Sequence, residues 1–325
     1  MRTACGALTH HAVRDRPLRR RLSARSDGRA DRSVVVLALA TAILTYALVV
    51  LGSTVRVTNS GMGCPSWPLC YGRAGPVDQY NALLEQSHRY LVSVVTVAVV
   101  LTAVTAWRSQ TRRIAFVPAA IAAGLVLFQA ALGAVTVFAH NAPWTVALHL
   151  VVGFGFFAST TITAVVAVRA RRGSWSPGAI PRSGWVAAAA TLALVTAGTL
   201  VVASGAGDDC PSWPLCTHAA PTGMIAWQLV HRAIAGIAGV CVIWFVAGRW
   251  RALSGWRNWR ILAGVLVGLL VIAAGFGAGS ALSKASAGWQ DLHLALAGAL
   301  WGTLVVLIAM LATSGPPLPA PDADA

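Results

Sequence analysis

The chain is 325 residues long, and 57% of its residues are hydrophobic while only 11% are charged. A soluble domain of this size carries about 25% charged residues, so the composition excludes an ordinary water-soluble protein. The net charge of +15 could suggest nucleic-acid binding, but the basic residues lie in short segments between long apolar blocks, which is typical of membrane topology and argues against a nucleic-acid partner.

The first 33 residues hold nine arginines and no apolar run, so they do not resemble a secretory signal. We expect residues 1–33 to form a disordered basic arm on the anionic inner leaflet. The Pro-rich, acidic tail over 313–325 is also expected to be disordered. Between them lie eight apolar blocks long enough to span a lipid bilayer as helices: 34–55, 87–107, 114–137, 144–168, 185–203, 225–247, 261–282 and 290–312.

An even number of spans places both termini on the same side of the membrane. If that side is the inner one, the inner segments hold 20 of the 25 Lys and Arg residues. Since cytoplasmic loops carry an excess of positive charge, we expect a multi-pass protein of the cell (plasma) membrane, in contact with lipid, with both termini cytoplasmic. The five remaining basic residues lie in or beside outer segments: Arg56, Arg73, Arg89, Arg232 and Lys284.

An internal repeat defines the architecture. Three landmarks recur in one order at nearly one offset: Cys-Pro-Ser-Trp-Pro-Leu-Cys at 64–70 and 210–216, His-Arg at 88–89 and 231–232, and His-Leu at 149–150 and 293–294. Each half contains four spans, so both halves enter the membrane in the same direction. The sequence therefore predicts an all-α membrane protein of two pseudo-symmetric four-helix bundles, 34–168 and 185–312, joined by a cytoplasmic linker over 169–184.

Four histidines lie at one depth, just inside the outer boundary of the even-numbered spans: His88, His149, His231 and His293. Histidines within membrane helices are costly and usually functional. A histidine that is simply hydrogen-bonded between helices is the alternative, but the duplication favours ligation. Two facing imidazoles suit bis-histidine heme ligation, whereas zinc needs three or four ligands. The other four histidines are expected to be solvated: His10, His11, His140 and His218.

The surroundings of these histidines are compatible with heme. Gly133 and Gly277 would leave room for a flat macrocycle, although ordinary close helix packing explains them equally well. Arg89 and Arg232 could pair with heme propionates, and snorkelling to the outer interface is the alternative.

The duplicated cysteines fall in outer loops. Outside the cytoplasm paired cysteines usually form disulfides, so we expect the bridges Cys64–Cys70 and Cys210–Cys216, with copper or another thiolate-bound metal as the alternative. Cys5 and Cys241 have no counterpart in the other half and are expected to be free.

The halves differ three residues before the first histidine, where Glu85 stands in one half and Gln228 in the other. Residues three apart share a helix face, so Glu85 should lie beside the first site. A carboxylate can move protons or stabilise developing positive charge; a solvated acid at a helix N-terminus is the alternative. We therefore predict that the first bundle is reactive and that the second is an electron-carrying cytochrome of b type.

These features resemble the heme A synthase family over residues 34–312: eight helices, paired cysteine loops after helices one and five, Glu-x-x-His in helix two, and histidines in helices four, six and eight. The stretch over 52–61 is also similar to the end of helix one in that family.

The resemblance implies a membrane-bound oxidoreductase that oxidises a ring methyl of heme O to a formyl group by two successive hydroxylations and loss of water. It implies that His88 and His149 hold heme O, that Glu85 is catalytic, and that His231 and His293 ligate the iron of a permanent heme b. A heme O synthase is the implied handover partner. The electron donor and the oligomeric state, including a homo-oligomer, stay open.

Two other functions compete with this one. A di-heme cytochrome b that only transfers electrons explains the four histidines but gives Glu85 no role. A transporter built on duplicated bundles would predict broken helices or charges near the midplane, and the sequence has neither.

Overall fold

The computed structural model describes residues 15–109, 113–216, 225–253 and 255–314. Over these ranges the chain forms helices only: α1 Asp15–Val57, α2 Tyr80–Arg108, the short 3-10 helix η1 Arg113–Ala115, α3 Phe116–Phe138, α4 Pro143–Arg171, α5 Arg182–Ala203, α6 Ile225–Trp250, α7 Arg257–Leu282 and α8 Ala287–Ala312. In this described part, eight helices are long and apolar enough to cross a membrane, which confirms the predicted spans.

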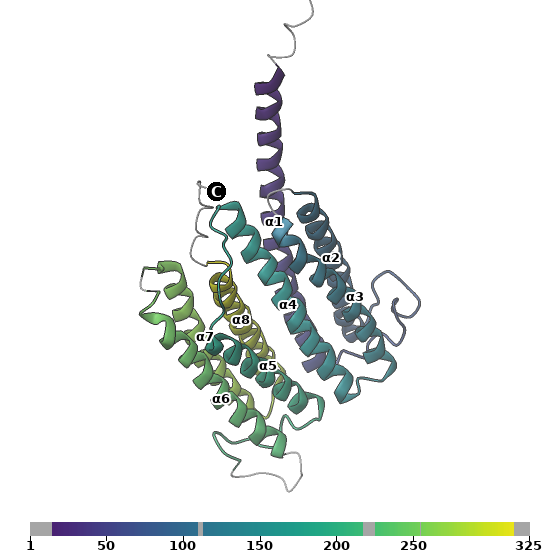
Figure 1. Cartoon of the computed structure of the whole chain (residues 1–325). Helices are drawn as coiled ribbons and strands as arrows, with labels where there is room; N and C mark the ends of the chain where they lie inside the picture. The colour runs from purple at the N-terminus through teal and green to yellow at the C-terminus, as the bar shows by residue number, and fades with distance from the viewer. Residues whose placement is uncertain (1–14, 110–112, 217–224, 254, 315–325) are drawn as a thin grey trace, which may run out of the picture.

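Helices α1 and α2 begin well before their predicted spans, whereas the other starts differ by four residues or fewer. Helix α2 starts at Tyr80 rather than at 87, because its polar first turns are covered by the preceding loop, and both Glu85 and Gln86 are buried there. Helix α1 starts at Asp15 and extends beyond the bundles as the long purple helix in Figure 1. The expected disordered arm is therefore wrong over 15–33, where Arg, Leu and Ala, all strong helix formers, predominate. Residues 1–14 and 315–325 lie outside the described residues.

The helices form two bundles side by side, α1–α4 and α5–α8 (Figure 1). Within each bundle consecutive helices pair as hairpins, α1 with α2, α3 with α4, α5 with α6 and α7 with α8. Helices α1 and α4 of the first bundle pack against α5 and α8 of the second. This arrangement confirms the predicted fold class.

The helix ends repeat between the halves even where the residues differ. After α3, His140 and Asn141 have φ values of 49° and 57°; after α7, Lys284 and Ala285 have φ values of 53° and 57°. In both turns the second residue donates its backbone N–H to a carbonyl five residues back, at 2.9 Å and 2.8 Å. The two halves thus share the backbone of these turns as well as the helices.

An apolar cluster joins the bundles: Val49, Phe154, Phe157, Val195, Trp301 and Val305. Hydrogen bonds orient this interface. The indole Nε1 of Trp301 donates to the carbonyl of Phe154 at 3.0 Å, and the Tyr46 hydroxyl donates to the carbonyl of Ala295 at 3.0 Å. Aromatic burial and these hydrogen bonds therefore connect the two halves.

Candidate functional site

Each of the four helix histidines packs against a glycine of the preceding helix. A Cβ added to Gly52 on α1 would lie 3.1 Å from Cε1 of His88 on α2, and one added to Gly198 on α5 would lie 2.9 Å from Cε1 of His231 on α6. The α3–α4 and α7–α8 hairpins repeat the contact: a Cβ added to Gly133 would lie 3.7 Å from Cε1 of His149, and one added to Gly277 would lie 2.9 Å from Cε1 of His293. The missing side chains let each imidazole lie against a helix backbone, which fixes where the ring stands.

The second bundle brings its two imidazoles together. The ring centroids of His231 and His293 are 6.3 Å apart. Two metal–imidazole bonds of about 2.0–2.1 Å, plus about 1.1 Å from each nitrogen to its ring centre, give a separation of roughly 6 Å. The spacing therefore fits one metal ion between the two rings, as in bis-histidine heme.

The orientation of His293 also suits ligation. Its Nδ1 lies 2.9 Å from the carbonyl oxygen of Ala273. Because a carbonyl only accepts a hydrogen bond, Nδ1 carries the proton and the lone pair of Nε2 is left for a metal. Most metal-binding histidines are oriented in this way, by a hydrogen bond from the ring nitrogen that does not bind the metal.

The other three histidines have unsatisfied ring nitrogens. The Nδ1 atoms of His88 and His149 in the first bundle, and of His231 in the second, are buried and have no hydrogen-bond partner. Buried polar atoms without a partner are rare, and they are expected where a bound group completes a site. Among the described residues no cluster of three or more His, Cys, Asp or Glu side chains could hold a metal, and the two helix histidines of each bundle are the candidate donors.

Both cysteine loops are closed by disulfides, as predicted. Cys64 is bonded to Cys70 with a Cα–Cα distance of 4.7 Å, and Cys210 to Cys216 with 5.3 Å. Cys241 is free, as expected, while Cys5 lies outside the described residues. The first loop packs on the start of α2, where Cys64, Cys70 and Ala82 form a buried cluster.

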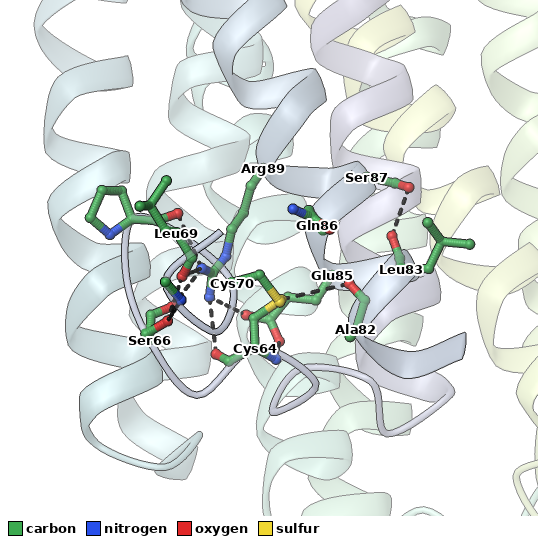
Figure 2. Close-up of a disulfide and its surroundings, with 12 residues drawn as sticks. Cys64, Ser66, Leu69, Cys70, Ala82, Leu83, Glu85, Gln86, Ser87 and Arg89 are labelled. Atoms are coloured by element: carbon green, nitrogen blue, oxygen red, sulfur yellow. Dashed lines mark hydrogen bonds and ion pairs between the residues drawn. A yellow bond between two sulfur atoms is a disulfide. The ribbon is translucent and has the colours of Figure 1, made fainter. Parts of the chain in front are cut away.

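The arginine next to each first histidine holds the adjacent loop. Arg89 donates through Nη1 to the carbonyls of Ser66 at 2.7 Å and Leu69 at 3.1 Å, and through Nη2 to the carbonyl of Cys64 at 3.2 Å (Figure 2). In the second bundle Arg232 donates to the carbonyls of Pro214 at 2.9 Å and Cys210 at 3.3 Å.

These loop bonds bear on the expected propionate contacts. Because both Nη groups of Arg89 already donate to loop carbonyls and to Glu85, a propionate at Arg89 would have to share or replace those bonds. The structure thus gives Arg89 and Arg232 a role that the sequence did not indicate, which is to couple the loop to the helix turn that bears the ligand.

Glu85 joins the same network in the first bundle only. It is 5% exposed. Its Oε1 forms an ion pair with Arg89 at 2.5 Å, and its Oε2 accepts a hydrogen bond from the backbone N–H of Cys64 at 2.8 Å (Figure 2). In the second bundle the amide Nε2 of Gln228 instead donates to the carbonyls of Ala206 and Gly207, at 2.8 Å and 2.9 Å. Glu85 on α2 is therefore buried, ion-paired and in contact with the loop, and α6 has an amide at the equivalent position.

Sequence reasoning missed the roles of Gly52 and Gly198. The signal was present, because these glycines are 146 residues apart, the same offset as the cysteine loops. Extending the repeat comparison to single glycines would have found them. The loop contacts of Arg89 could not be found in this way, since backbone carbonyls have no sequence signature.

Comparison with known proteins agrees with this geometry. The family described as cytochrome oxidase assembly protein matches residues 35–306, which is most of the chain. The chain belongs to this family. Its relatives include proteins named heme A synthase: one from Geobacillus kaustophilus is 28% identical over 316 residues, covering 91% of this chain and 97% of the relative. Another, from Lysinibacillus sphaericus, is 28% identical over 286 residues, covering 81% and 90%.

A third relative has a different name. A protoheme IX farnesyltransferase from Halobacterium salinarum is 31% identical over 156 residues, which is 48% of this chain but only 33% of that protein. The similarity to the heme A synthases extends over nearly the full length of both chains and supports membership of the heme A synthase family.

Proposed function

We propose that this protein is a heme A synthase, which oxidises a ring methyl of heme O to a formyl group. The observation that carries the proposal is the asymmetry of the duplicated site. Both bundles present an imidazole pair on equivalent helices, but only the first places a buried carboxylate, Glu85, one turn before its histidine. Full-length similarity to proteins named heme A synthase supports the same assignment.

The two bundles have different roles in this proposal. His88 and His149 would hold heme O as the substrate, and His231 and His293 would hold a permanent heme b. The fixed tautomer of His293 and the 6.3 Å ring spacing suit a permanent ligand pair.

The chemistry is a four-electron oxidation. Written with water as the oxygen source, the methyl and one water give the formyl group, four protons and four electrons. Two successive hydroxylations by O₂ reach the same product: each would consume one O₂, two electrons and two protons and release one water, and the hydrated aldehyde then loses a further water. When bound, heme b would supply a one-electron relay between the first site and a partner, which is an electron donor where O₂ is the oxidant. Glu85 would take up protons released at the ring methyl, because it is the buried carboxylate closest in sequence to the first ligand.

The loop over 64–70 would control access to Glu85. The carboxylate is bonded to the Cys64 N–H and to Arg89, and Arg89 donates to four loop carbonyls. Each proton that reaches Glu85 must therefore be accommodated within a network that the disulfide keeps compact.

The proposed setting is the plasma membrane with both termini cytoplasmic and the cysteine loops outside. The proposed partners are membrane lipid, an unidentified electron donor and a heme O synthase. The partial match to a farnesyltransferase supports the last of these, since a segment similar to this chain occurs there within a longer protein. The oligomeric state stays open.

Heme extraction tests the function. Expressed in a bacterium that makes heme O but no heme A, the protein should produce heme A, detected by chromatography of acid-acetone extracts. Accumulation of heme O without any heme A, from a protein that binds both hemes, would contradict the assignment and favour a di-heme cytochrome.

A further inference from the structure

A side-chain amide lies directly beside the second ligand of the first bundle. Gln129 on α3 donates from Nε2 to the backbone carbonyl of His149 at 2.8 Å. A carbonyl only accepts, so the amide must present its nitrogen there and its Oε1 must point elsewhere. That Oε1 is buried and has no hydrogen-bond partner. The first bundle therefore contains an unused buried acceptor next to His149.

The fold makes room for this amide. A Cβ added to Gly153 on α4 would lie 2.8 Å from Nε2 of Gln129. In the second bundle, 144 residues later, the equivalent positions are Ala273 and Ala297. The first bundle thus pairs a long amide with a glycine where the second pairs two alanines. Because both members of the pair differ together, the amide occupies a place that the helix packing provides for it.

The same position contacts the ligand histidine in both bundles. Gln129 lies one helical turn from Gly133, against which His149 packs. In the second bundle the backbone carbonyl of Ala273 accepts the hydrogen bond of His293 Nδ1 at 2.9 Å. A side chain at this position is therefore close enough to the ligand to meet the edge of a bound macrocycle.

We propose that Gln129 Oε1 accepts a hydrogen bond from an alcohol hydroxyl of the substrate heme and so selects heme O over heme b in the first bundle. This inference rests on the proposed function. Heme O carries a hydroxyl on the alkyl chain that replaces one vinyl group of heme b. A site with a buried acceptor discriminates strongly against a ligand that leaves the acceptor unpaired.

Two alcohols could fill this role, the one on the alkyl chain and the one formed when the ring methyl is first hydroxylated. The depth of Gln129 in the membrane favours the alcohol on the alkyl chain. A porphyrin carries its ionised propionates on one edge, and these would face water at the outer surface. In the proposed topology α3, which spans Phe116–Phe138, runs outward, so Gln129 would lie on the inner side of His149. The opposite porphyrin edge, which bears the alkyl chain, faces that side.

The double variant Gln129→Ala/Gly153→Ala tests the proposal, because it copies the alanine pair of the second bundle and so preserves packing. The variant and the unmodified protein are purified from cells that make heme b and heme O, and the extracted hemes are quantified. We expect the ratio of heme b to heme O plus its oxidised products in the first site to rise on the order of tenfold, as for loss of one buried hydrogen bond. The converse variant, Ala273→Gln/Ala297→Gly, should admit heme O to the second site.

The outcomes separate the two alcohols and the two proposals. An unchanged heme ratio with accumulation of the hydroxymethyl heme would support Gln129 as an acceptor for the ring alcohol instead. If the unmodified protein contains heme O but neither quantity changes in the double variant, the role of Gln129 is overturned and the proposed function stands. If the unmodified protein contains heme b alone, the proposed function fails, and the role of Gln129 with it.

Discussion

At the scale of single residues, the two halves differ in that one has the carboxylate of Glu85, which accepts two hydrogen bonds, where the other has the amide of Gln228. Glu85 accepts from Arg89 and from the Cys64 N–H, whereas Gln228 donates to two loop carbonyls. An amide at position 85 would direct an N–H group at either the guanidinium or the backbone N–H, since it has only one acceptor oxygen. The loop contact and the proton-accepting group therefore depend on the same side chain.

The variant Glu85→Gln should abolish heme A formation while both hemes still bind, because the change removes a proton acceptor and leaves all four histidines in place. Heme extraction and the visible spectrum of the purified variant measure both effects. Asp78→Asn is the matched control, since Asp78 is an exposed acid in the loop that precedes α2. Full activity in Glu85→Gln would show that the carboxylate is not part of the reaction.

Substitution of single ligands should affect the bundles separately. His231→Ala should remove the heme b spectrum and leave heme O bound, and His88→Ala should do the reverse, because each iron depends on its own imidazole pair. Optical spectra and pigment ratios distinguish the two losses. His140→Ala, at an exposed position, is the control. If both ligand variants lost the same pigment, the assignment of one heme to each bundle would be wrong.

At the scale of helices, the site depends on hairpins in which a glycine of one helix receives the imidazole of the next. The variant Gly277→Ala should weaken retention of heme b on the order of tenfold, because the new Cβ would lie 2.9 Å from the His293 ring and force it to shift. The heme remaining after gel filtration measures this. Gly275→Ala, two residues away with nothing within 4 Å of the added Cβ, should retain heme normally. Equal retention in both variants would contradict the packing role of the glycine.

Each cysteine loop is closed by a disulfide. The first loop packs on the start of α2, and the second is bonded to Arg232 of α6. The variant Cys64→Ser/Cys70→Ser should lower the free energy of unfolding by about 2 kcal/mol, because the bridge closes a short loop. Arg89 still bonds several carbonyls of that loop, so heme binding should survive. Thermal denaturation in detergent checks the first effect, with Cys241→Ser, a free cysteine, as the control. A collapse of heme binding would mean that the disulfide, and not Arg89, positions the loop.

At the scale of the whole molecule, duplication made most of the fold predictable. Apolar blocks predicted the eight spans, and the repeated cysteine and histidine motifs predicted the two bundles, because membrane burial and repeat offsets leave direct marks in a sequence. The histidine ligands stay a prediction. The prediction of disorder over 15–33 was wrong, because the high charge of this segment indicated disorder whereas its Arg, Leu and Ala residues favour a helix. The contacts of Arg89 and Gln129 were not predictable, because both side chains bind backbone carbonyls.

The charge distribution predicts the orientation of the molecule in the membrane. A membrane-impermeant thiol reagent should label the four loop cysteines in intact cells only after reduction, because those loops should lie outside the cytoplasm and both disulfides should be formed. Mass spectrometry of the labelled peptides identifies the sites. Labelling confined to inside-out vesicles would reverse the proposed topology.

The most direct test of the central claim is the heme content of the purified protein. The account predicts two hemes per chain, heme b together with heme O or heme A, and one heme per chain when both histidines of either bundle are replaced by alanine. A protein that stayed colourless when produced with abundant heme, or that held heme b alone in both bundles, would contradict it.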